Sequence, residues 1–185
     1  FAATHFSAAA GALGWAVTEW MVRGKPSVLG TASGMVAGLA TITPASGFVT
    51  VPGAFLIGLA GGVVCFLGVT KLKAKLGYDD SLDVFGVHGL GSTVGMLMLG
   101  FLASKDINAA IDGTFKVNGI ALSLAGGGAQ FLNQLKGVVF TMLFSGVATF
   151  LILKFIKVTI GLRVSEEQED LGLDLAEHNE RAYSD

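Results

Sequence analysis

A long stretch without charge limits the fold more than any other feature. No residue from Pro26 to Thr70 is charged, and Pro44, Gly47 and Pro52 interrupt the stretch near its middle. A helix needs roughly 20 mainly apolar residues to cross the hydrocarbon core of a bilayer. The two halves of the stretch therefore predict two membrane crossings that are joined by a tight turn.

The composition also favours a membrane protein. Of 185 residues, 52% are hydrophobic and 14% are charged, and the mean hydropathy is +0.67. An ordinary soluble domain has about 25% charged residues. The 27 glycines suit membrane helices that pack closely. These values exclude intrinsic disorder, and the chain contains no basic run or motif that would predict a nucleic-acid partner.

Three further apolar segments complete the expected set of helices. They are Phe1–Val22, Val84–Ser104 and a segment centred on Gly137–Leu153. We therefore expect an all-α polytopic membrane helix bundle in the lipid bilayer. Its five transmembrane helices are predicted at 1–22, 27–43, 51–72, 82–103 and 132–160.

The remaining segments are expected to lie outside the bundle. The five helices form one region, 1–161, and a polar tail follows at 162–185. The segment Val117–Leu135 is uncharged, but three consecutive glycines and several amide side chains interrupt it. We interpret that segment as a long loop with a short helix.

The basic residues are distributed unevenly between the two sides of the predicted bundle. One side has Arg23, Lys25, Lys71, Lys73, Lys75, Lys154, Lys157, Arg163 and Arg181, and the other has Lys105, Lys116 and Lys136. Basic residues concentrate on the cytoplasmic side of cell membranes. The tail is therefore expected in the cytoplasm and Phe1 on the outer side, and we expect earlier spans to precede Phe1.

An acidic segment leads into an apolar span at Asp79–Gly89, which reads DDSLDVFGVHG. Asp80 or Ser81 can cap the first amides of a helix, and Asp83 adds negative charge at the positive end of the helix dipole. We therefore interpret Asp80, Ser81 and Asp83 as structural helix-capping residues.

His88 is the candidate for a substrate pathway. It lies about 12 Å along the helix from Asp80, near the middle of a hydrocarbon layer about 30 Å thick. Ionisable residues at that depth commonly mark ion or proton routes. The alternative is a structural histidine that ties two helices together. An imidazole can donate or accept one hydrogen bond, which permits ammonia, water or proton relay.

The surroundings of His88 do not predict a metal site or an enzyme. On an ideal α-helix it shares a face with Ser81, Val84, Gly91, Ser92 and Gly95, none of which is an acid or a cysteine. The single Cys65 offers no multi-cysteine site. No Ser-His-Asp or Gly-x-Ser-x-Gly arrangement supplies a nucleophile. We expect no metal, no cofactor and no enzymatic activity.

Several separated motifs resemble one known family. The run Asp80–Gly91, DSLDVFGVHGLG, is similar to the signature of the ammonium transporter family (Amt/Mep/Rh), and Gly24–Ser27, Thr43–Ala45 and Gly161–Tyr183 resemble the same family in the same order. The resemblance implies an eleven-span inverted-repeat transporter, of which this chain is similar to spans seven to eleven and the tail.

The resemblance also implies a function. Family members are homotrimers that recruit ammonium outside, deprotonate it and pass ammonia along a hydrophobic pore with a histidine pair. His88 matches the second histidine, Val84 and Val36 would line the pore, and Thr43 would lie near its outer end. The first histidine and the recruitment site match no residue of this chain, so the missing N-terminal half would supply them. Asp80 matches a position related by pseudo-symmetry to an acidic residue of that half.

The tail has two interpretations. Its composition is typical of a solvated polar tail. The resemblance instead implies a protein of the plasma membrane whose tail lies in the cytoplasm, where it couples the subunits and regulates them. Many family members also bind a PII signalling protein on that face. The regulatory residues would be Arg163, Glu166, Glu167, Asp174 and Tyr183.

Three alternatives stay open at this point. The chain could belong to an ammonium sensor of the same family, to an Rh-type gas channel, or to a membrane enzyme that uses His88 as an acid or base. The tail from Arg163 to Tyr183 favours the Amt branch over the Rh branch. A fused signalling domain would favour the sensor, and an enzyme would need a second catalytic group.

Overall fold

The structure is a computed structural model that describes residues 1–117 and 120–181. It divides into two units, Phe1–Val139 and Phe140–Asp185, which we describe separately.

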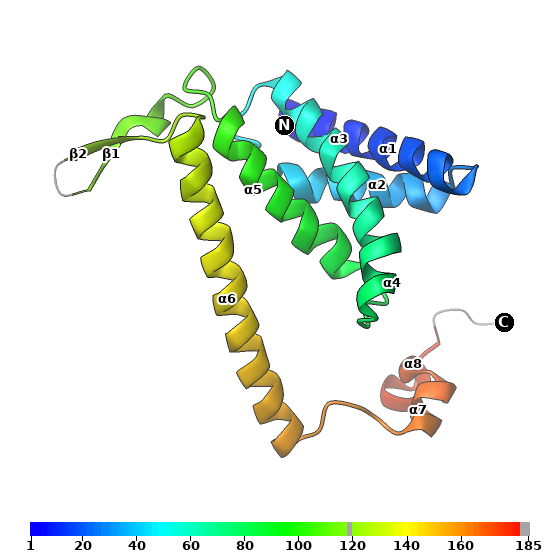
Figure 1. The fold of residues 1–185 in the computed structure, drawn as a ribbon. Coiled ribbons are helices and arrows are strands. Elements are labelled where there is room, and N and C mark those ends of the chain that lie inside the picture. The colour runs from blue at the N-terminus through cyan, green and yellow to red at the C-terminus, as the bar shows by residue number, and fades with distance from the viewer. Residues whose placement is uncertain (118–119, 182–185) are drawn as a thin grey trace. The chain divides into compact units, whose positions relative to one another are not determined.

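Helices make up most of the first unit (Figure 1). The first two are α1 (Ala2–Arg23) and α2 (Val28–Ile42). The third is a continuous helix made of α3 (Val51–Leu67), η1 (Gly68–Leu72) and α4 (Lys73–Leu76), and the fourth is made of η2 (Phe85–Gly89) and α5 (Leu90–Leu102). The start of α6 (Gly128–Thr159) completes the unit. Both η1 and η2 are π-helical turns. The third helix therefore continues past the expected residue 72, and Leu82 lies in a turn before the fourth.

Local side chains fix where α2 and α3 begin. The Ser27 hydroxyl accepts a hydrogen bond from the Gly30 N–H, and Thr50 accepts one from the Gly53 N–H. Hydroxyl caps of this kind satisfy amides that have no partner inside the helix. Pro44 follows the end of α2, where its ring prevents the helix from continuing.

Glycines let α1 pack tightly against α2 and α3. A Cβ atom added at Gly38 or Gly58 would collide with the backbone of Ser7, and one added at Gly62 would collide with the carbonyl of Gly11. The Ser7 hydroxyl also donates to the Gly38 carbonyl, at 2.9 Å. Gly38, Gly58 and Gly62 are therefore contacts between helices.

The two π-turns also contact each other through glycine. A Cβ atom at Gly86 would approach Val69 Cγ2 to 2.6 Å, and one at Gly68 would lie 3.6 Å from the Gly86 carbonyl oxygen. Around these crossings the core forms two apolar clusters. One contains Ala3, Ile42, Ala45, Val49, Ala54, Ile57 and Leu99, and the other contains Trp15, Ala37, Ala40, Cys65, Phe66 and Val87.

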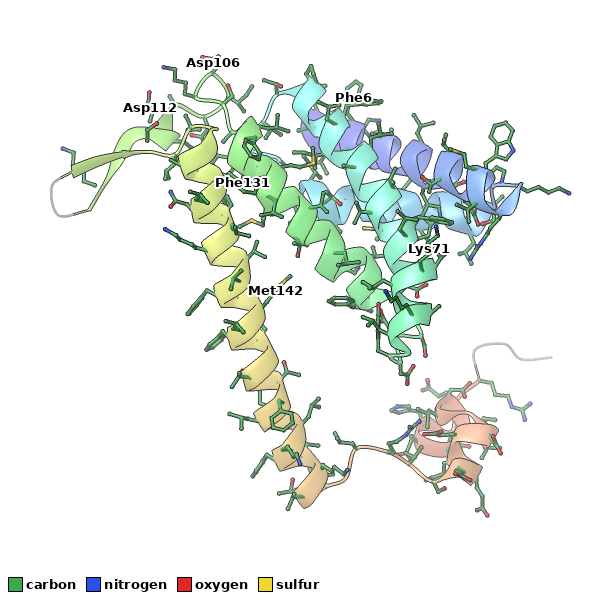
Figure 2. The ribbon with its side chains drawn as sticks, in the orientation of Figure 1. Phe6, Lys71, Asp106, Asp112, Phe131 and Met142 are labelled. Carbon is green, nitrogen blue, oxygen red and sulfur yellow. The ribbon has the colours of Figure 1, made fainter. Side chains whose placement is uncertain are left out.

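The connection between α5 and α6 differs from the expected loop. It contains η3 (Ala109–Ile111), a 3₁₀ turn, and an antiparallel hairpin of β1 (Asp112–Val117) and β2 (Ile120–Ser123). Asp106 and Asp112 mark this connection in Figure 2. The helix α6 then begins at Gly128 rather than at residue 132.

The glycine run before α6 has a packing role that its composition did not reveal. The N–H groups of Gly126 and Gly127 donate to the carbonyls of Ala103 and Gly100. Gly126 also lies against the carbonyl of Phe101, where a Cβ atom would collide. These glycines close the last turn of the connection against the end of α5.

Three helical segments of the described residues are long and apolar enough to cross a membrane. They are Val51–Leu76 with 26 residues, Phe85–Leu102 with 18 and Gly128–Thr159 with 32. The apolar helix α2 is shorter, with 15 residues. The 22-residue helix α1 contains buried polar side chains, Ser7 and Glu19.

The second unit consists of the rest of α6 and two short helices. Most apolar side chains of α6 in this unit are exposed, among them Met142, which is labelled in Figure 2. The short helices are α7 (Glu166–Leu171) and α8 (Leu173–His178). Ser165 and Gln168 form a capping box at the start of α7, in which each side chain bonds the other's backbone N–H.

Candidate functional site

Asp80 begins the helix that contains His88. One Asp80 carboxylate oxygen accepts a hydrogen bond from the Val84 N–H at 2.8 Å, and the other accepts one from the Phe85 N–H at 2.9 Å. The Ser81 hydroxyl donates to Asp79 Oδ1 at 3.3 Å. Of the two residues expected to compete for the cap, Asp80 therefore bonds the first-turn amides.

Asp83 lies in an ion pair with α4. Its backbone has φ of 55°, a left-handed conformation that few non-glycine residues adopt. Lys73 Nζ lies 2.7 Å from Asp83 Oδ1 and also donates to the Asp80 carbonyl. Lys73 thereby links α4 to the segment that precedes η2. From the sequence Lys73 is only one of the basic residues of one side, because the turn that brings it to Asp83 has no distinct sequence signal.

The π-turn η2 changes the face on which His88 lies. Gly86 and Val87 are buried, whereas His88 is exposed. Farther along, Gly91 and Gly95 are buried against the buried Thr41 of α2. A π-turn adds one residue to a helical turn, which rotates all later side chains relative to earlier ones. An ideal α-helix would place His88 on the same face as Gly91 and Gly95. The π-turn places His88 on a different face from these two glycines.

A cavity of about 190 Å³ lies beside His88. Its lining consists of Trp15 from α1, Ser33 and Val36 from α2, and Leu82, Asp83, Val87 and His88 from the fourth helix and the turn before it. Val36, His88 and Asp83 thus line the same cavity. Trp15 and Ser33 were missed, because tryptophan suits an interface belt and serine is common in helices.

Two expected pathway residues lie outside this lining. Val84 is 52% exposed. Thr43 is exposed at the far end of α2, where its hydroxyl donates to the Leu39 carbonyl at 2.7 Å. Thr43 is seven residues from Val36, which corresponds to about 10 Å along a helix.

A buried carboxylate positions the start of α2. Glu19 is 2% exposed, and it accepts hydrogen bonds from the Ser27 N–H at 3.1 Å, from the Ser27 hydroxyl at 3.1 Å and from Arg23 at 3.0 Å. A buried charge is stable only when it is paired and hydrogen-bonded, as here. Glu19 therefore fixes the helix that carries Ser33 and Val36. Within residues 1–117 and 120–181, no cluster of three or more acids, histidines or cysteines could hold a metal ion.

The expected tail residues lie in the second unit. Arg163 donates to Glu169 at 3.1 Å from Nε and lies 3.0 Å from it at its terminal nitrogen. Glu166 and Glu167 occupy the first turn of α7, and Asp174 the first turn of α8. Tyr183 lies outside the described residues.

The sequence model of the Ammonium Transporter Family matches residues 1–183. The chain belongs to the ammonium transporter family. It is 44% identical to an ammonium transporter of Bacillus subtilis over all of this chain and 44% of that protein. It is 41% identical to ammonium transporter Amt1 of Archaeoglobus fulgidus over 98% of this chain and 43% of that protein.

A solved structure of the family has a similar fold. The crystal structure of Candida albicans Mep2 matches with a TM-score of 0.78 and 32% identity, over 95% of this chain and 38% of that one. These values confirm the all-α membrane-transporter fold expected from the sequence. The chain spans less than half the length of the curated relatives above.

Asp80→Ala tests the cap that starts the helix containing His88. Loss of the two hydrogen bonds should lower the free energy of unfolding by about 0.5–2 kcal/mol. The thermal melting of the purified protein in detergent measures this loss. The matched control is Ser81→Ala, which should change the stability by less than about 0.5 kcal/mol because Ser81 is exposed. Equal melting temperatures for both variants would contradict the capping role.

Proposed function

We propose that this chain forms the C-terminal half of a transporter that moves ammonium across the plasma membrane. The proposal rests on a cavity that both His88 and the apolar Val36 line, in a chain that belongs to the ammonium transporter family. Ammonium would be recruited outside and would lose its proton, and ammonia would then pass while the proton crosses by a separate route. Moving an unpaired cation into an apolar medium is very costly, which favours the neutral form.

The roles of the pathway residues follow from this proposal. His88 donates or accepts one hydrogen bond to the passing molecule, since a neutral imidazole can do either. Val36 and Val84 keep the surroundings apolar, and Thr43 lies toward the outer end of the route. Asp80 holds the start of the His88 helix and does not bind the substrate.

We further infer that a preceding half covers the exposed side of His88. A polar ring in an apolar segment is costly to expose to lipid and usually faces a bundle interior. His88, Val84 and Val36 are exposed, as packing against such a half requires. In an inverted-repeat transporter the substrate route runs between the two halves. The first histidine of the pair would come from the missing half.

The function is tested by reconstituting the full-length protein in liposomes. An ammonium gradient should drive a current that protein-free liposomes lack, whereas equal gradients of sodium or potassium should not. If neither the current nor the ammonia flux exceeded that of protein-free liposomes, transport would be rejected. An Rh-type gas channel would instead move ammonia without net charge, so ammonia flux without current would favour that alternative.

A sensor is the second candidate, because a solved Sensor Amt Protein matches with a TM-score of 0.79 and 26% identity, over 95% of this chain and 40% of that one. A sensor must bind ammonium and change its conformation, but it needs no flux. Ammonium-dependent spectral changes without current in the liposome assay would favour the sensor.

We propose five crossings with the tail in the cytoplasm, and labelling tests this topology. The side chain of Cys65 is buried, so introduced cysteines can be labelled separately. A reagent added outside should reach a cysteine placed at Asp106, and one added inside should reach a cysteine at Lys75 and in the tail. At least about tenfold selectivity between the two sides is expected, because the reagents do not cross lipid. External labelling of the tail would reverse the orientation.

We propose that the tail couples the subunits of a homotrimer and offers a site to a PII signalling protein. Removal of residues from Glu166 onward should lower transport by about fivefold or more, because typical coupling free energies of about 1–3 kcal/mol change an equilibrium by at least that factor. The oligomer should remain intact in size-exclusion chromatography. As a control, Glu169→Gln removes only an exposed ion pair and should change transport by less than about twofold. Unchanged transport and unchanged PII binding after truncation would remove both roles.

A further inference from the structure

An ion pair contributes to the wall of the cavity beside His88. Asp83 lines this cavity, and its carboxylate oxygen lies 2.7 Å from Lys73 Nζ. The side chains are partly buried, at 29% exposure for Lys73 and 35% for Asp83. Lys73 lies in α4 and does not line the cavity, so it acts on the cavity through Asp83.

Asp83 is the one carboxylate among the residues that line this cavity. The neighbouring lining side chains are apolar or neutral, among them Trp15, Ser33 and Val36. A lone carboxylate in such partly buried surroundings attracts a monovalent cation strongly, because the apolar walls screen charge less than water does. A cation held there would leave slowly.

Lys73 cancels this charge from outside the cavity. We propose that Lys73 is a positioning residue, whose ion pair with Asp83 keeps the cavity from retaining the ammonium that forms when ammonia regains its proton. This inference rests on the proposed function. Lys73 also donates to the Asp80 carbonyl, so a purely structural role is the competing explanation. The two explanations differ in the kinetics of a double variant.

The test uses the full-length protein in the liposome current assay, with ammonium as the probe. Lys73→Met leaves Asp83 without its partner. The apparent KM and the maximal current should then both fall by about three- to tenfold, because ammonium binds more tightly and leaves more slowly. Adding Asp83→Asn removes the excess charge. The double variant should therefore recover at least half of the wild-type maximal current, with a higher KM than Lys73→Met alone.

Lys71→Met is the matched control, since Lys71 is exposed on the neighbouring turn η1 (Figure 2) and is not among the residues that line this cavity. It removes the same charge from the same end of the helix and should leave KM and maximal current within about twofold. An equal effect of Lys71→Met would overturn the inference.

A structural role gives a different pattern, which would also overturn the inference. Lys73→Met would then lower the melting temperature and the maximal current with KM unchanged, and the double variant would recover neither. An absent wild-type current rejects the proposed function and the inference with it. A normal wild-type current with an unchanged KM in Lys73→Met rejects the inference alone.

Discussion

Replacing His88 with alanine should lower the ammonium current of the full-length protein at least about fivefold. The imidazole is the polar side chain that the fourth helix offers to the cavity beyond the Lys73–Asp83 ion pair. Loss of one hydrogen-bond partner in a buried route costs about 1–3 kcal/mol, which corresponds to a fall in current of about fivefold to 150-fold. The current in liposomes and the melting temperature should be measured for the same preparation.

His5→Ala is the matched control for this experiment. His5 is an exposed histidine that stacks on Phe1, with ring centroids 6.1 Å apart, and it does not line the cavity. Its replacement should leave the current within about twofold. If His88→Ala retained the current and lost oligomer stability, His88 would be a structural histidine and the pathway assignment would be wrong.

His88→Glu separates conduction from selectivity. A carboxylate at the same position can hold a partly hydrated cation, because its charge offsets part of the lost hydration. Potassium should therefore become a current carrier while the ammonium current persists. The ratio of ammonium to potassium currents measures the change, and we expect it to fall by at least about tenfold. Unchanged exclusion of potassium would show that His88 does not set selectivity.

The second large effect is expected when this chain is expressed alone. Residues 1–185 in liposomes should give no ammonium uptake above protein-free liposomes, because the wall that contains Val36, Val84 and His88 would face lipid. Co-expression with the preceding half of the transporter should restore uptake. The restored level should reach at least about a tenth of the intact protein, since the halves must associate before they can form a route.

A matched control for this experiment is the same pair of halves with His88→Ala in this chain. It should assemble but should not transport. Uptake by residues 1–185 alone would contradict the shared route, and restored uptake that is insensitive to His88→Ala would contradict the role of the histidine.

The helices could be predicted from the sequence because apolar runs directly encode them. The uncharged stretch from Pro26 to Thr70 predicted two helices, and α2 and α3 lie within it. The capping role of Asp80 also followed from its place before an apolar run. Such signals are local, and each depends on residues within one or two turns of a helix.

The contacts that shape the cavity could not be predicted in the same way. Lys73 meets Asp83 only because the turn at Gly77, with φ of 64°, reverses the chain between them. Glu19 meets Ser27 because α1 and α2 pack through glycines. The π-turn at His88 has no sequence signature, and it changes which residues share a face. Each of these features depends on tertiary geometry, which periodicity does not contain.

The π-turn η2 also constrains which insertions and deletions the chain can tolerate. Deleting one residue from Phe85–Gly89 would restore a regular α-helix and rotate the side chains on one side of the deletion by about 100° relative to the other. Either His88 would turn from the cavity, or Gly91 and Gly95 would turn from Thr41 and larger side chains would collide with its backbone. The extra residue in this turn lets His88 face the cavity while Gly91 and Gly95 contact Thr41. Variants that differ in length here should therefore be rarer among functional transporters than variants that differ in side chain.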